Sequence, residues 1–545
     1  MHPANTDYLA HTSARVKHPN YFIVVKSWGG ADRYFSMKPV KGATRPYIVC
    51  LKGLRSVSQK ITPEEGQSSI GTLSFSLLDK NDRITALLAS PIRKKRVELW
   101  GGYDELDESK YIRLATNLIE DFEVTQGLTE YSFKTADLQR SIKSKVFKPK
   151  VTSLTAGLSQ GALSATVAST TGFLTVVHPS LGTCGYVRID DEIIRWTAKG
   201  DTSFTIQRGQ FNTADVAHST DAEVKELIVF QEHPLAVALK VLMSTGAGTN
   251  GDYDTLPFHW ALGIDEALVD VSKWESEGAD WLKFNPTDHT LGYQFRFIYD
   301  EEAEAKKFIE DEILKPLNAY PLVSADGSLS IKAFSPPVPF VELPRLDEKV
   351  LQVKSMGGGL TAVINVALFE YDYDFISRQY LRNVEYSDGE SISEQGQSET
   401  FKVSSRGIRT DLNGTAIIAE RWARIKQRFS RPVPTIPVKA FYSKHLLEPG
   451  ELVNFSHANL PDMAAGERGA DEKIVELVNK GLDLQAGAVN YEMMMTSFGK
   501  RYCLFAPDSV PDYDEATEEQ KRRYGWFGDE DGKVNSGSEE GYRYA

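Results

Sequence analysis

The stretch SIGTLSFSLLD, from Ser69 to Asp79, decides the fold class. Polar and apolar residues alternate along it, with Leu73, Phe75 and Leu77 forming the apolar set. A period of two residues predicts a half-buried strand. Similar stretches rich in β-branched and aromatic residues are YFIVVKS (Tyr21–Ser27), RVELWGG (Arg96–Gly102), IEDFEV (Ile119–Val124) and TEYSFKTAD (Thr129–Asp137). Short strands at this spacing favour a barrel or sandwich over a fold of alternating strands and helices.

The whole chain has 545 residues, which suggests about three or four domains. Hydrophobic residues make up 41% and charged residues 25%, as in a folded globular protein. The net charge of −13 disfavours general binding to nucleic acid or to anionic lipid. The first residues do not form a secretory signal, and no apolar run is long enough to cross a bilayer.

Cysteine usage gives no chemistry. Cys50, Cys184 and Cys503 are odd in number and lie far apart in the sequence. This spacing fits neither a disulfide framework nor a zinc site. We expect three reduced thiols in a protein made in the cytoplasm.

Changes in pattern divide the chain into five parts. Strand patterns dominate residues 1–148 and 339–505, and a small polar β-rich stretch interrupts the first half. Helical periodicity appears at 230–338 and in one helix within 339–505. We therefore expect a mainly β multidomain (α+β) protein. The expected parts are an N-terminal β-barrel-like domain (1–148), an inserted small β module (149–229), an α/β domain (230–338), a second β-barrel-like domain with a flanking helix (339–505) and an acidic, aromatic C-terminal tail (506–545). The tail combines 11 acidic and 5 basic residues with several aromatics, so we weigh docking onto a partner against a solvated tail.

Three helices are expected. The first begins at Pro234, with Gly246 as its stop, and has Leu235, Leu239 and Leu242 on one face. The second has its apolar face at Ala305, Phe308, Ile309 and Ile313 and ends at Pro316. The third is capped by Asp411, carries the stripe Ile418, Trp422, Ile425 and Phe429, and ends before Pro432. Between the second and third, the pair Asp326-Gly327 predicts a hairpin turn.

Two glycine-rich motifs resemble functional signatures. Gly246 to Gly251 matches the dinucleotide pattern GxGxxG, but a helix precedes it and no helix follows, so we expect a helix end running into a loop. Gly157 to Gly161 matches the nucleophile pattern GxSxG around Ser159. The Thr, Val and Ser residues after it do not favour the helix that a nucleophile elbow needs, so we expect a surface turn.

Acidic and histidine residues also give no site. Asp190, Asp191 and Glu192 lie between two strand patterns and are expected to be a hairpin turn with solvated charges. The stretch around Asp529 lacks the first and last ligands of a calcium loop. His233 is expected to begin a helix, and His457 to end a strand. We predict no catalytic, cofactor-binding or metal-binding residue and no cofactor, and therefore no enzyme.

Two sets of motifs carry a resemblance. YVRIDDEIIRWTAKGDTSFTIQRGQFNTADVAHSTDAEV (Tyr186–Val224) resembles a small β module of tailed-bacteriophage tail proteins, with Arg208, Gly209, Gln210, Thr213 and His218 at the positions of its pattern. SFSLLDKNDRITALLASPIRKKRVELWGGYDE (Ser74–Glu105), IEDFEV and YSFKTADLQRSI resemble the opening barrel of tail-hub proteins. LEPGELVNFSHANLPD (Leu447–Asp462) and KGLDLQAGAVNYEMMM (Lys480–Met495) resemble their closing barrel.

The resemblance implies the central hub of a phage tail tip or baseplate, a structural protein of the virion. Two related barrels in each chain would let a homotrimer match a sixfold tail tube. The implied partners are distal tail and tail-tube proteins, the tape-measure protein, and fibre or receptor-binding proteins. DNA would pass only in transit, and an acidic lumen would let it slide. Two alternatives remain: a receptor-binding or carbohydrate-binding tail protein that uses the insert, and a wall-degrading hydrolase.

Overall fold

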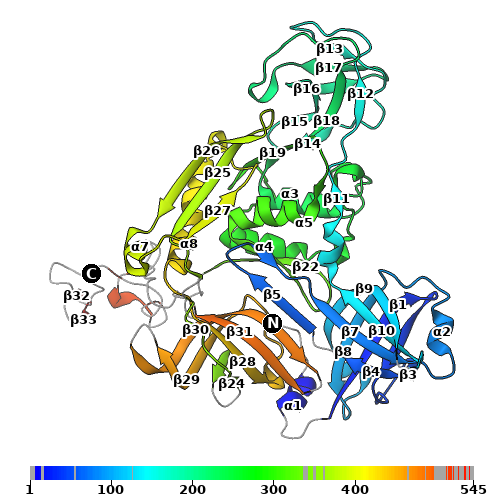
Figure 1. Ribbon diagram of the computed structural model, residues 1–545, viewed down its shortest axis with the longest axis vertical. Coiled ribbons are helices and arrows are strands. Elements are labelled where there is room, and N and C mark those ends of the chain that lie inside the picture. The colour runs from blue at the N-terminus through cyan, green and yellow to red at the C-terminus, as the bar shows by residue number, and fades with distance from the viewer. Residues whose placement is uncertain are drawn as a thin grey trace.

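The computed structural model describes residues 6–13, 18–54, 57–125, 127–335, 342–347, 351–359, 362–462, 466–484 and 486–495, with 511, 513–517, 520, 526, 533–534 and 539–540 beyond them. The chain is mainly β and has several sheets, as predicted. Two β structures lie side by side at one end, helices lie in the middle, and a small β module lies at the far end (Figure 1). Cys50 and Cys184 are buried free thiols. Cys503, the calcium-loop candidate at Asp529 and most of the predicted tail lie outside the described residues.

The N-terminal ring consists of strands that close on themselves by hydrogen bonding. Around the ring the order is β3/β4, β7, β10, β9, β8, β1 and β2, and β3 then pairs with β2. β3 and β4 follow each other directly in the chain, so together they form one closing segment, which pairs with β2 at one end of the row of strands and with β7 at the other. The elements are α1 (Thr6–Ser13), β1 (Pro19–Trp28), β2 (Ala31–Ser36), β3 (Tyr47–Val49), β4 (Leu51–Leu54), β5 (Val57–Thr62), β6 (Gln67–Ser68), β7 (Thr72–Leu78), α2 (Arg83–Leu87), β8 (Arg96–Tyr103), β9 (Ile112–Thr125) and β10 (Glu130–Ala136).

The C-terminal ring is built in the same way. Its order is β24, β28, β31, β30 and β29, and β23 pairs with β29. The segment that carries β23 and β24 therefore bonds to both ends of this row. The strands are β23 (Arg345–Asp347), β24 (Leu351–Val353), β28 (Thr435–Phe441), β29 (Leu452–Asp462), β30 (Glu467–Asp483) and β31 (Ala488–Met495). His457 lies inside β29 and does not end it, so the strand continues five residues further than expected.

The two rings share one topology. In each, the chain passes through the closing segment and then four strands, and the spatial order is closing segment, first, fourth, third, second. The closing segment starts parallel to one neighbour and ends antiparallel to the other in both rings. The N-terminal ring differs by one added hairpin, β1–β2, between its second strand and its closing segment. A shared order of five strands defines an internal repeat.

The middle of the chain is a helical and β region with one core. Its helical elements are α3 (Pro234–Met243), α4 (Val271–Trp281), α5 (Ala305–Lys307), the π-helical turn η6 (Phe308–Leu314), α6 (Lys315–Leu317), α7 (Gly389–Gln395) and α8 (Gly414–Phe429). Its strands are β11 (Lys145–Val146), β19 (Phe295–Tyr299), β20 (Ala303–Glu304), β21 (Ala319–Val323), β22 (Leu329–Ala333), β25 (Val366–Asp374), β26 (Gln379–Ser387) and β27 (Thr400–Ser404). Buried side chains of β25, β27 and α8 pack in the same cluster as those of α3 and β22, so residues 366–429 group with this region across the expected limit at 338/339.

The expected helices form, with changes at their ends. The predicted stripe of α8 is buried, but its N-cap is Asn413, because Asp411 lies in the preceding turn and pairs with Arg296 at 2.9 Å. The helical stretch that was expected to stop at Pro316 continues to Leu317 and ends at Asn318 in the left-handed region. His233 caps α3, as predicted, by accepting a hydrogen bond from the Leu235 amide at its Nδ1. Asp326-Gly327 forms the predicted turn between β21 and β22, with Gly327 at φ +86°.

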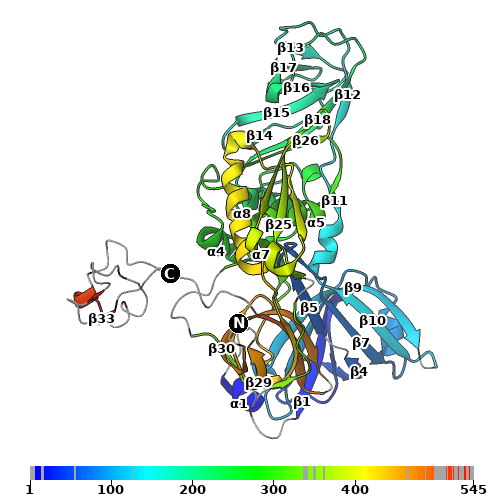
Figure 2. The ribbon, with the colours of Figure 1, turned by 60° about the vertical axis from the view of Figure 1, so that its left-hand side comes forward.

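The insert is a separate β core that continues into the middle region. Its strands are β12 (Val151–Ser153), β13 (Ser164–Thr166), β14 (Val176–His178), β15 (Gly182–Ile189), β16 (Glu192–Lys199), β17 (Ser203–Gln207) and β18 (Glu223–Glu232). β18 also pairs with β19 of the middle region, so the module is attached through a strand that both parts share. Figure 2 shows it projecting away from the rings.

Candidate functional site

A buried carboxylate organises the insert. Glu192, at the start of β16, is 1% exposed. It accepts hydrogen bonds from Arg208 Nε and Nη2 at 2.8 and 2.7 Å and from the Gly209 amide at 2.9 Å. His218 Nε2 lies 2.9 Å from the same carboxylate, and His218 Nδ1 lies 2.7 Å from Asp190. Burial alone would raise the pKa of Glu192, but the hydrogen bonds from Arg208 and Gly209 lower it to about 2.

This network explains the motif positions in the insert. Arg208 also donates to the Ser159 carbonyl at 2.7 Å, and so joins two loops. Thr213 Oγ1 accepts from the Ile193 amide at 3.0 Å. The motif residues therefore clamp the loop after β17 onto the β15–β16 turn, which gives them a structural role.

The expectation of solvated charges in the acidic turn is wrong at one residue. Asp190 and Asp191 are exposed in the turn, but Glu192 faces inward, toward the side chains of Arg208 and His218 and the amides of Gly209 and Val216. A buried carboxylate is stable only with such compensation. The sequence contains the partners of Glu192, since an arginine and a histidine both follow within the same module. Their spacing does not show that they contact this carboxylate.

The two glycine motifs have structural explanations. Residues 157–161 are exposed except for Leu158, whose backbone pairs with that of His218, and no helix follows them, as predicted. The loop that begins at Gly246 wraps around a carboxylate of its own chain. Asp254 accepts from the amides of Thr245, Thr249 and Asn250 at 2.6, 2.9 and 3.1 Å. Burial would raise the pKa of Asp254, but a hydrogen bond from the Thr245 hydroxyl and these amide bonds lower it to about 2. The backbone donors that a phosphate would need are therefore already used.

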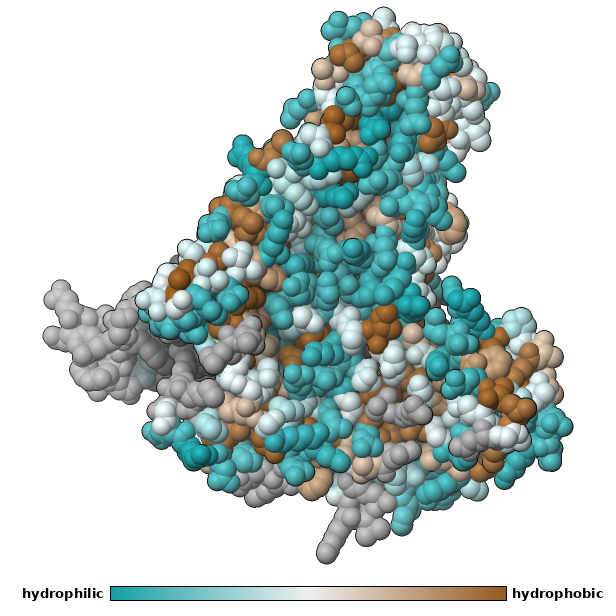
Figure 3. Space-filling model, in the orientation of Figure 1, coloured by the Kyte–Doolittle hydropathy of each residue, from teal (hydrophilic) through white to brown (hydrophobic). Residues whose placement is uncertain are grey.

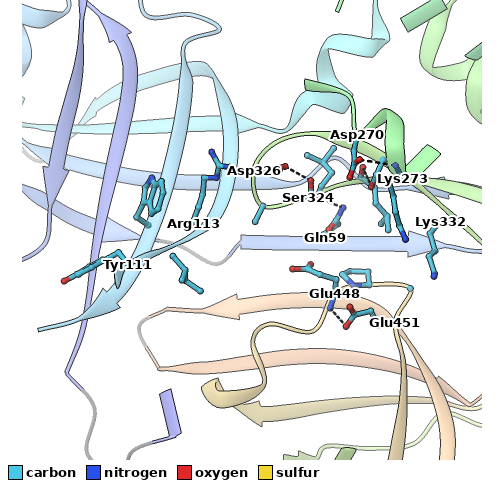
Figure 4. A pocket seen from close by; sticks show the side chains of 18 residues that line it. Gln59, Tyr111, Arg113, Asp270, Lys273, Ser324, Asp326, Lys332, Glu448 and Glu451 are labelled. Carbon is cyan, nitrogen blue, oxygen red and sulfur yellow. Dashed lines mark hydrogen bonds between the residues drawn. The ribbon is translucent and has the colours of Figure 1, made fainter. Parts of the chain in front are cut away.

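A cleft of about 890 Å³ lies between the two rings and the middle region. Figure 4 shows side chains from all three parts converging on it. Among the described residues that line it there is no histidine or cysteine. Its charged residues are Arg113, Asp270, Lys273, Asp326, Lys332, Glu448 and Glu451. Several are already paired: Lys332 contacts Glu277 at 3.1 Å, and Glu448 accepts from Lys480 at 2.8 Å. Ser324 Oγ donates to Asp326 Oδ1 at 2.6 Å, and the same carboxylate oxygen accepts from Ser328 Oγ at 2.7 Å, so this pair closes the β21–β22 turn.

One helix ties both rings to the middle region. On α8, buried Arg428 pairs with Glu476 of β30, and Glu476 also accepts from Tyr320 at 3.1 Å. Seven residues earlier, buried Arg421 donates to the Glu64 carbonyl beside β5 at 2.8 Å. Broken buried pairs cost several kcal/mol, so these contacts fix the rings against α8.

The rings also contact each other directly. β5, which follows the closing segment of the N-terminal ring, pairs antiparallel with β30 from Asn479 to Leu482. This pairing makes one continuous sheet of 16 strands, and the buried side chains of both rings form one hydrophobic cluster. The two rings therefore form a single folded unit, although some 200 residues separate them in sequence.

The internal repeat extends to individual hydrogen bonds. In each ring, one residue of the third strand makes two backbone hydrogen bonds to the two residues that precede the second strand. Its carbonyl accepts from the first of them at 2.7 Å, and its amide donates to the carbonyl of the second at 3.0 Å. These positions are Ile119 with Lys94 and Lys95, and Leu477 with Gly450 and Glu451. Lys94 and Gly450 both have positive φ, +62° and +84°. A β-bulge follows at once, at Glu120 in one ring and Val478 in the other. Residues 112–125 thus correspond one by one to residues 470–483, and residues 130–136 to residues 488–494.

Comparison with known proteins gives a consistent class of structural neighbours. No family model and no curated protein matches the sequence. Similar solved structures are a tail protein from Neisseria meningitidis MC58 (10% identity, TM-score 0.39, 88% of this chain and 96% of that chain) and the tail protein of prophage MuSo2 from Shewanella oneidensis (8%, 0.38, 87% and 98%). A third is a prophage tail protein from Listeria monocytogenes EGD-e (8%, 0.38, 87% and 94%). The neighbours are thus phage tail proteins. In the described part of the chain, no helix has the length and apolar character needed to cross a membrane.

Proposed function

We propose that this chain is a structural protein of a bacteriophage virion, the central hub of a tail tip or baseplate. It would join the tail tube to the tip and fibre proteins, hold the end of the tape-measure protein, and form part of the channel through which DNA leaves. The observation that carries the proposal is the internal repeat: two rings in one chain share strand order, bulge position and hydrogen-bond register. The motifs quoted above for hub barrels lie in these same rings.

The repeat has a simple geometric use. Three identical chains in a cyclic ring present three N-terminal and three C-terminal rings. Because the two kinds are alike, six similar units can face a sixfold tube. The fixed ring-to-ring contact through β5 and β30 would hold neighbouring units at one angle.

Native mass spectrometry of the full chain tests the proposal. Three chains of 60.8 kDa give about 182 kDa. A trimer of this mass supports the hub, and averaged images of it should show six similar units around a central opening. A chain that stays monomeric at every concentration, and also when it is mixed with the tail-tube protein, would contradict it.

The alternative function, receptor or carbohydrate binding through the insert, requires aromatic side chains on an exposed distal face. The aromatic residues of the insert are buried or half-buried instead: Phe173, Tyr186, Trp196, Phe204 and Phe211. On the face drawn in Figure 3, apolar residues lie in scattered patches and not in one continuous surface. We therefore prefer the hub. Zymography on peptidoglycan addresses the other alternative, a hydrolase, and a clearing zone would contradict a purely structural role.

A further inference from the structure

We infer that β9 of one copy pairs with residues 356–358 of a second copy, so that the N-terminal ring of one chain continues the C-terminal ring of the next. The inference rests on the proposed function and names the surface through which the copies would assemble. The template for this contact is the pairing that already joins the two rings within one chain.

Within one chain, β5 pairs with one strand of each ring. Ser58 lies opposite Thr72 of its own ring and opposite Gly481 of the other ring. Around it, Val57 and Gln59 lie opposite Leu482 and Lys480. The stretch after the closing segment of one ring thus becomes the next strand beside the third strand of the other ring.

The C-terminal ring has the corresponding stretch. Gly357 lies opposite Thr435, the residue equivalent to Thr72, so Gly357 corresponds to Ser58. In the third strands, residues 122–124 correspond to residues 480–482 by the register that the bulges set. The template then pairs Gly358 with Phe122, Gly357 with Glu123 and Met356 with Val124.

Among the described residues, no strand pairs with the far side of either edge. Within the described residues, the backbone of 121–124 pairs only with β10, and the Phe122 amide donates to the Asp121 carboxylate at 2.9 Å. Ser355, Met356 and Gly358 make no backbone–backbone hydrogen bond to any described residue. An unpaired strand edge favours addition of a further strand.

Burial points to the same surface. Lys480, which lies opposite Gln59 of β5 and pairs with Glu448, is 6% exposed, whereas the equivalent Phe122 is 36% exposed. Leu482 is 2% exposed, and its equivalent Val124 is half-buried. An exposed phenylalanine on an open edge gains from being covered. The occupant is a second copy because the matching edge is on this same chain, and such a head-to-tail contact closes into a ring when the rotation permits.

Disulfide cross-linking of the full chain tests the pairing. In a Cys503→Ser background, Glu123→Cys with Gly357→Cys places two thiols at directly opposed positions of neighbouring copies. Mild oxidation should give covalent dimers and trimers on a denaturing gel. Cys50 and Cys184 are buried and should not react. The control pair is Glu123→Cys with Gly389→Cys, because Gly389 is exposed with open space around it. After the same oxidation, this variant should run as a single chain on the denaturing gel.

A second variant does not depend on disulfide geometry. Phe122→Asp should weaken trimer formation at least tenfold in native mass spectrometry, whereas Leu128→Asp, at the exposed tip of the same hairpin, should not. Circular dichroism confirms that each variant is folded. A trimer that forms without this cross-link and tolerates Phe122→Asp overturns the inference and leaves the hub intact. A wild-type chain that never forms a trimer overturns both.

Discussion

Removal of the buried charge of Glu192 should release the loop that the insert motif clamps. Glu192→Gln keeps the shape of the side chain but leaves Arg208 without its main counter-ion. Loss of one partner of a buried pair costs about 3–5 kcal/mol. Asp215 remains 3.0 Å from Arg208, so we expect the lower end, about 3 kcal/mol. At about 1.4 kcal/mol per factor of ten, this corresponds to a roughly hundredfold larger opening constant.

Hydrogen exchange of the full chain, followed by mass spectrometry, measures this directly. Amides of residues 209–218 should exchange about a hundredfold faster in Glu192→Gln, while those of β9 and β30 stay unchanged. Asp191→Asn is the matched control, since Asp191 is exposed in the same turn, and it should have almost no effect. If the two variants behave alike, Glu192 does not hold the loop and our account of the motif is wrong.

Three further perturbations test other parts of the structure. Arg428→Met leaves Glu476 buried without its cation and should lower the free energy of unfolding by about 3–5 kcal/mol in denaturant titrations, and Glu476→Leu in the same chain should restore part of it. Burial lowers the pKa of His233 to about 4, below its value in the unfolded chain. The stability that neutral His233 contributes is therefore full above about pH 6.5 and should be lost as the pH falls from 6.5 to 4. His233→Gln should reduce this dependence of the melting temperature on pH. Gly66→Ala should lower the melting temperature more than Gly127→Ala: both have positive φ, but a Cβ at Gly66 meets the Lys315 backbone at 2.7 Å and one at Gly127 meets nothing.

Much of the fold follows from local pattern. The alternation in β7, the apolar stripe of α8 and the Asp326-Gly327 turn each depend on neighbours in sequence, and the structure confirms all three. The cap of α8 was wrong because Asp411 has a distant partner, Arg296, that competes for its carboxylate. Helix ends depend on such contacts, and local sequence does not contain them.

The candidate site is harder to predict from the sequence than the fold. The acidic turn looked solvated because adjacent residues were judged together, yet only Glu192 turns inward, toward Arg208 and His218 that lie 16 and 26 residues later. Asp254 is equally hard to identify from sequence, since all but one of its donors, the Thr245 hydroxyl, are backbone amides that carry no side-chain signal. Both carboxylates are identified only when the chain folds back on itself.

The internal repeat shows why similarity of sequence is a poor guide to this architecture. Asp121 to Val124 reads DFEV, and the equivalent Asn479 to Leu482 reads NKGL. What the two stretches share is a position immediately after a bulge, beside a turn that ends at a residue with positive φ, Lys94 or Gly450. Backbone geometry of this kind accepts many side chains, so the constraint lies on hydrogen-bond register and not on residue type. The residues differ where the contacts differ: Lys480 and Leu482 are covered by β5, whereas Phe122 and Val124 still present an open edge. The side chains of the two third strands are expected to differ at this edge if the C-terminal ring makes its contact within the chain and the N-terminal ring makes the corresponding contact with another copy.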